Sequence, residues 1–130
     1  MRQLFLFAFL LPVLALNAQT DITNSVVAAF KKADAGAIAT MCTDQVELSV
    51  SGQEELYSRE EAKGILNTFF SHHAVKSFTI KHQGTSKMDD QYRIGELITA
   101  TGAFRVTFFM KRSGNSMQIR QLKIESPDDY

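Results

Sequence analysis

The spacing of apolar positions is helical in the first half of this chain and alternating in the second half. Apolar residues at helical spacing follow Asp21, which predicts a helix that Asp21 caps. Asp34 precedes a second, shorter stretch of the same kind. Residues 46–50 then alternate between apolar and polar side chains, which predicts a strand, and residues 54–57 predict its short return strand.

A capping box marks the start of a third, longer helix. The Ser58 hydroxyl can accept a hydrogen bond from the amide of Glu61, and the Glu61 carboxylate can reach back to the amide of Ser58. The helix is expected to end near His72 and His73. One apolar face follows from the positions of Ala62, Ile65, Leu66, Phe69 and Phe70.

After this helix the pattern alternates with period two and predicts four strands. They cover about residues 75–85, 91–101, 103–112 and 116–125, and short turns rich in Gly, Asp and Asn separate them. Such short turns require antiparallel neighbours. The order of elements predicts an α+β fold with three helices in the N-terminal half and a curved, mostly antiparallel sheet that wraps round the long helix.

The first eighteen residues have the pattern of a secretory signal peptide. Residues 1–3 carry one basic charge, residues 4–16 are almost wholly apolar, and Ala18 ends a plausible cleavage site. The apolar run is shorter than the roughly 20 residues that a membrane-spanning helix needs. We therefore expect an exported protein, periplasmic or secreted, whose residues 19–130 form a single domain.

Charge and cysteine content narrow the range of partners. Without Arg2 the mature chain has thirteen basic and fourteen acidic residues, so no basic surface favours nucleic acid or an anionic membrane. Cys42 is the sole cysteine and cannot form an internal disulfide; its place on a helical stripe indicates a buried, inert thiol. No metal, cofactor or nucleotide motif is present, and the side chains of His72 and His73 diverge too far to chelate one metal well.

The order of elements, with the segment ADAGAI (33–38) leading into TDQVEL (43–48), resembles the nuclear transport factor 2-like superfamily, the cystatin-like roll, over residues 20–126. A narrower likeness is carried by the segments YSREEA (57–62), HQG (82–84), YRIGEL (92–97) and GAFRV (102–106). In these segments the chain resembles a family of small exported bacterial domains of unknown function. The resemblance implies a cavity between the concave side of the sheet and the helices, and it supplies no activity.

Enzymes of this superfamily do not match the chain closely. The isomerase branch has a carboxylate base on the strand after the second helix, where this chain has only Glu47, out of phase with the apolar positions. The dehydratase branch uses a histidine and an acidic residue in the cavity, for which His82 and Glu96 are candidates. Two residues at unknown separation do not transfer a catalytic role.

Strand phase predicts which side chains face the helices. The purest apolar set is Phe104, Val106, Phe108 and Met110; the inward sets of the two preceding strands are then Phe78, Ile80 and His82, and Tyr92, Ile94, Glu96, Ile98 and Ala100. His82 and Glu96 would be polar side chains on apolar faces, where a desolvated carboxylate and an imidazole can act as an acid/base pair. The alternative is that Glu96 pairs with an arginine at the sheet rim and that His82 caps the core.

From the same phases we predict the lining of a ligand pocket. Aromatic packing alone also explains the two tyrosines of this set. The pocket residues are Tyr57, Phe69, His82, Tyr92, Glu96 and Phe108.

The opposite face of the sheet is predicted to be apolar and covered. Leu97, Phe109, Met117 and Ile119 fall on it, and relatives of the resembled fold commonly pair back to back through the sheet, so we expect a homodimer. Ile119 and Leu122 cannot face the same way in a regular strand. A β-bulge near Arg120 or Gln121 would reconcile them, as would Ile119 lying inside.

Three functional classes remain. A non-catalytic exported domain that binds a small apolar ligand or a partner protein is the first and the favoured one. A small lyase or isomerase that uses Glu96 and His82 is the second, and a structural, homodimeric assembly module is the third.

Overall fold

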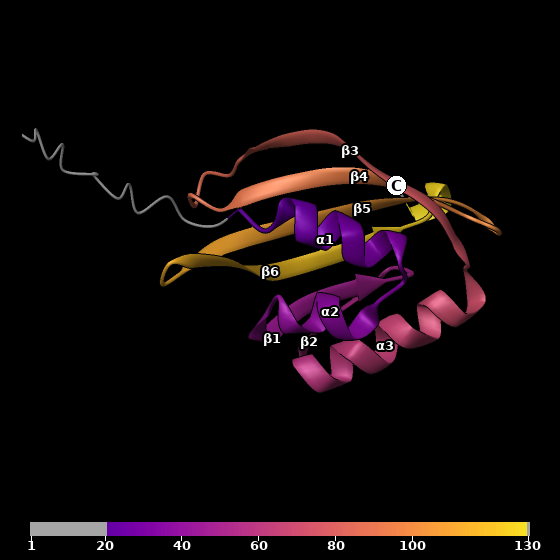
Figure 1. Cartoon of the computed structure of the whole chain (residues 1–130), viewed down its shortest axis with the longest axis horizontal. Helices are drawn as coiled ribbons and strands as arrows, with labels where there is room; N and C mark the ends of the chain where they lie inside the picture. Colours follow the sequence, from indigo (N-terminus) through magenta and orange to yellow (C-terminus); the bar gives the residue numbers. More distant parts are fainter. Residues whose placement is uncertain (1–20, 130) are drawn as a thin grey trace, which may run out of the picture.

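Three helices lie on one face of a six-stranded sheet in the computed structural model, which describes residues 21–129 (Figure 1). The predicted α+β fold is confirmed, with every predicted helix and strand present. A short 3-10 helix follows the last strand. The elements are α1 (Thr23–Lys31), α2 (Ala35–Thr40), β1 (Cys42–Val50), β2 (Gln53–Ser58), α3 (Arg59–His72), β3 (Val75–Thr85), β4 (Gln91–Thr99), β5 (Gly102–Ser113), β6 (Ser116–Glu125) and η1 (Pro127–Asp129).

The strands lie in the order β2-β1-β6-β5-β4-β3. β1 pairs with β6 in parallel, and each of the other neighbouring pairs is antiparallel. The two hairpins of the C-terminal half therefore form one side of the sheet, and the β1–β2 hairpin extends the other side. β2 and β3 are its edge strands.

Two of the three predicted helix caps are confirmed, and the N-cap of the first helix lies one residue later than predicted. Asp34 caps α2, because its side chain accepts the amide of Ala37 at 3.0 Å. The capping box of α3 is confirmed, with Ser58 and Glu61 each accepting the other's amide. The N-cap of α1 is Ile22 rather than Asp21, whose carboxylate accepts the amide of Thr23 at 2.9 Å.

The core lies between the helices and the concave face of the sheet. Phe30 of α1 stacks on Phe78 of β3 with ring centroids 4.8 Å apart and meets Phe70 of α3 edge to face at 5.9 Å. Cys42 is buried, and burial raises the pKa of its thiol to about 12, as expected for an inert thiol. The inward set of β5 is confirmed: Val106, Phe108 and Met110 are fully buried and Phe104 packs against the core.

Two register shifts decide which side chains of β6 and β3 face the core. In β6, Ile119 pairs with Met110 and Gln121 with Phe109, so Arg120 forms the predicted bulge and both Ile119 and Leu122 are buried.

In β3, Ile80 pairs with Gly95 and His82 with Ile94, so one extra residue lies at Lys81. The bulge turns His82 away from the helices and toward the outer face of the sheet. The prediction that His82 faces inward is therefore wrong.

The predicted phase of β4 is also wrong. Its residues share a face with the β5 residues opposite them, and Leu97 lies opposite Phe104 while Glu96 lies opposite Arg105. Leu97 is fully buried, and Glu96 is exposed on the outer face. Both alternating sets of β4 contain apolar side chains, so hydrophobicity alone did not distinguish them.

The predicted signal peptide, residues 1–18, lies outside the described residues. Within residues 21–129, no helix has both the length and the apolar character needed to cross a membrane.

Candidate functional site

The structure divides the six predicted pocket residues among four places. His82 and Glu96 line one small hollow on the outer face, Tyr57 and Phe69 line a groove beneath α3, Tyr92 lies on the outer face, and Phe108 is sealed in the core.

The outer hollow lies over β3, β4 and β5 and has a volume of about 180 Å³. It does bring His82 and Glu96 to one place, yet both side chains are exposed to solvent. An exposed carboxylate keeps its hydration, so the desolvation on which the acid/base hypothesis depends is missing. The sheet partner of Glu96 is Arg105, which also lies 3.5 Å from Glu125. Glu96 thus lies beside an arginine, as the alternative expected, whereas the exposed His82 does not cap the core.

Tyr92 has a packing role on the outer face. Its ring lies over the backbone of Gly84, where an added Cβ would meet the phenol at 2.5 Å, and it packs against Phe109 at 5.8 Å between centroids. The ring thus covers a residue that has no side chain of its own in β3.

The groove beneath α3 runs between this helix and strands β1 and β2. It consists of two adjoining hollows of about 330 and 170 Å³ that share Val50 and Ile65. Phe69 lines the larger hollow and Tyr57 the smaller one. Most of the edge strand β2 is exposed, and Ile65 of α3 is half-buried where it lines the groove.

His73 closes the end of the larger hollow. Its ring packs against Phe69 at 4.6 Å and Phe104 at 4.9 Å, and Nδ1 lies 2.5 Å from the Thr101 hydroxyl. Burial, and then the nearby charge of His72, lower the pKa of His73, so the imidazole is neutral at pH 7. The groove therefore has an apolar floor and an uncharged hydrogen-bonding group at its rim.

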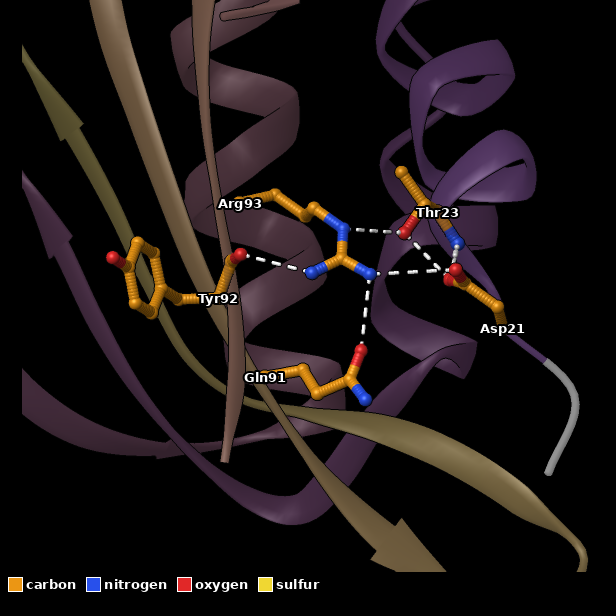
Figure 2. Close-up of polar contacts among 5 residues, drawn as sticks. All are labelled: Asp21, Thr23, Gln91, Tyr92 and Arg93. Atoms are coloured by element: carbon orange, nitrogen blue, oxygen red, sulfur yellow. Dashed lines mark hydrogen bonds and ion pairs between the residues drawn. The ribbon is translucent and has the colours of Figure 1, made fainter. Parts of the chain in front are cut away.

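Sequence reasoning missed a buried arginine, Arg93, which joins β4 to the start of α1 (Figure 2). Its guanidinium donates to Thr23 Oγ1 at 3.1 Å, to Tyr92 O at 2.9 Å and to Gln91 Oε1 at 3.1 Å, and it lies 3.3 Å from Asp21 Oδ2. The side chain is only 7% exposed. All three guanidinium nitrogens contact protein atoms, so Arg93 is a structural clamp. The correct phase of β4 would have shown an arginine among inward residues.

The predicted dimer face needs correction as well. Leu97, Met117 and Ile119 are buried in the core, because β4 has the opposite phase and β6 bulges at Arg120. Only Phe109 of the predicted four lies on the outer face. The outer face does carry apolar side chains, which are Leu56, Tyr92, Ile94, Ile98, Ala103 and Phe109.

A model of a domain of unknown function, DUF4783, matches residues 23–125. The chain belongs to this family. A DUF4783 protein from Bacteroides fragilis is 34% identical and superimposes with a TM-score of 0.75, over 82% of this chain and 100% of that one. No curated protein matches the chain.

More distant structures share the fold of this DUF4783 domain. A protein with NTF2, for nuclear transport factor 2, in its name has a TM-score of 0.64 at 15% identity, over 79% of this chain and 92% of that one. An uncharacterized cystatin fold protein from Novosphingobium aromaticivorans has a TM-score of 0.53 at 12% identity, over 79% and 93%. These likenesses confirm the predicted roll and carry no activity.

Proposed function

We propose that this DUF4783 domain is an exported, non-catalytic binding domain that holds a small apolar ligand in the groove beneath α3. The observation that carries the proposal is the composition of the groove. Val50, Ile65 and Phe69 supply apolar walls, and a hydroxyl-bonded, neutral His73 stands at one end.

Size and polarity support a small ligand. Binding pockets for small molecules commonly measure about 300–1,000 Å³ and combine apolar walls with a few polar groups. The two hollows, about 330 and 170 Å³, reach the lower part of that range. A ligand that lies along both would cover Ile65 and contact Tyr57.

A pair of tryptophan variants tests the groove. Ile65→Trp should fill the groove, whereas Leu56→Trp adds the same ring on the outer face of β2, where Leu56 is 58% exposed. With 1-anilinonaphthalene-8-sulfonate as the probe, we expect fluorescence enhancement with the wild type and with Leu56→Trp, and loss of at least half of it with Ile65→Trp. Equal enhancement in all three proteins would reject the groove as the binding site.

Export follows from the pattern of residues 1–18, and the mature chain would begin at Gln19. That end lies two residues before Asp21, which Arg93 holds against the sheet. N-terminal sequencing of the protein from the exported fraction should read from Gln19. A cytoplasmic protein that retains Met1 would contradict export.

We also propose a homodimer through the outer face of the sheet. The exposed, apolar Leu56 on this face favours it. One row across the outer face runs from Leu56 on β2 through Glu47 and Gln121 to Phe109 on β5, so it carries an apolar residue at the β2 edge and another near its middle. Two-fold pairing would cover both side chains. Sedimentation equilibrium should give a dimer that Phe109→Glu dissociates, and a wild-type monomer at micromolar concentration would reject the proposal.

A further inference from the structure

A polar cleft lies at the end of the sheet where β1 separates from β6. The register joins Cys42 to Ile119 and Glu47 to Gln121, so residues 43–46 of β1 face only Arg120 of β6. Because this stretch of β1 leaves the ladder, the sheet opens there into a cleft of about 590 Å³. All of its lining side chains are polar.

Two arginines in the cleft are held in fixed orientations. Arg59 donates through Nε to Cys42 O at 2.8 Å, and its Nη1 lies 3.0 Å from Asp44 Oδ1. Arg120 places Nε and Nη2 at 2.8 and 2.7 Å from Oδ2 of Asp90, whose side chain is 12% exposed. Within residues 21–129, Nη2 of Arg59 and Nη1 of Arg120 make no polar contact, so each guanidinium keeps donors for a ligand.

The charges at the cleft favour an anion. Arg59, Arg120 and the exposed Lys111 supply three positive charges. Asp90 already faces Arg120, and Asp44 is 91% exposed and holds Arg59 only through a surface ion pair. Such surface pairs contribute little free energy, so an incoming anion can replace Asp44 at low cost.

We propose that this cleft binds a small molecule through an oxyanion, a carboxylate or a phosphate. Arg59 and Arg120 would donate to the oxyanion from two sides, since a guanidinium matches the geometry of both groups. Lys111 would add a third positive charge from the β5 side. The site is separate from the groove beneath α3, which lies at the other end of β1.

Titrations followed by two-dimensional ¹⁵N–¹H NMR test this site. The protein is titrated separately with sodium phosphate and with sodium succinate, each against sodium chloride at matched ionic strength. We expect saturable shifts at the amides of residues 43–45 and at the Nε–H groups of Arg59 and Arg120. The tighter of the two anions identifies the headgroup.

Variants that avoid the buried Asp90 make the test specific. Lys111→Met should weaken binding about two- to fivefold, and Asp44→Asn should strengthen it by a similar factor. Lys76→Met, an exposed lysine on β3, is the matched control and should bind as the wild type does. Ile65→Trp should also leave anion binding unchanged, which separates this site from the groove. Shifts no larger than those with chloride, or unchanged affinity in Lys111→Met, would overturn the proposal.

Discussion

At the residue scale, Arg93 joins the start of the helical layer to the sheet. Its guanidinium is buried and its hydrogen bonds reach Asp21 and Thr23 at the start of α1. We expect Arg93→Met to lower the free energy of unfolding by about 1–3 kcal/mol, because Tyr92 O and Gln91 lose a charged donor. Urea denaturation measures this change. The exposed Arg112, changed to Met, should shift stability by less than about 0.5 kcal/mol, and equal effects of the two changes would contradict the clamp.

His73 should make stability depend on pH. Because its pKa is lowered from the ordinary value of 6.5, the folded protein binds fewer protons than the unfolded chain between the two values. The contribution of the neutral His73 side chain to the free energy of unfolding is fully present above about pH 6.5, and it is lost as the pH falls through the lowered pKa. His73→Gln should flatten this part of the stability profile, whereas His82→Gln, at an exposed site, should keep it. Denaturation midpoints of the wild type and both variants, measured from pH 4.5 to 8, check this prediction. An unchanged profile in His73→Gln would contradict it.

At the element scale, the phase of each strand decides which of its side chains face the core and which face solvent. The elements themselves could be predicted, since capping residues and a change of period from helical to alternating mark them. The phase of β5 was also readable, because one alternating set was purely apolar. For β4, both sets contain apolar residues, and only pairing with β5 decides between them.

The candidate sites were harder to predict for the same reason. Tyr57 and Phe69 line the groove beneath α3, and Phe69 belongs to the clear apolar face of that helix. His82 was misplaced by a bulge at Lys81 that the sequence did not reveal. The polar cleft forms where β1 separates from β6. These two strands are far apart in the chain, so no local sequence pattern predicts their separation.

Two identical glycine substitutions should have opposite effects on these elements. In β4, a Cβ at Gly95 would lie 2.7 Å from the Phe78 ring, so Gly95→Ala should cost about 1–3 kcal/mol of stability. In α3, a Cβ at Gly64 would meet no atom within 4 Å, so Gly64→Ala should add up to about 1 kcal/mol through helix propensity. Thermal unfolding compares them, and an unharmed Gly95→Ala protein would contradict the close packing of β3 on β4.

At the scale of the whole molecule, one roll presents surfaces of different chemistry. The helical side carries an apolar groove, the outer face carries scattered apolar and charged residues, and one end of the sheet carries a cationic cleft. The candidate acid/base pair is solvent-exposed, whereas the groove is the feature that resembles a binding site. We therefore propose binding without catalysis for this DUF4783 domain.

Native mass spectrometry of the wild-type protein from its own exported compartment, compared with its mass after denaturation, tests this claim most directly. We expect a small molecule that is released from the wild-type protein on denaturation and is absent from Ile65→Trp purified in the same way. A wild-type protein that carries nothing, or an Ile65→Trp protein that retains the same molecule, would contradict it.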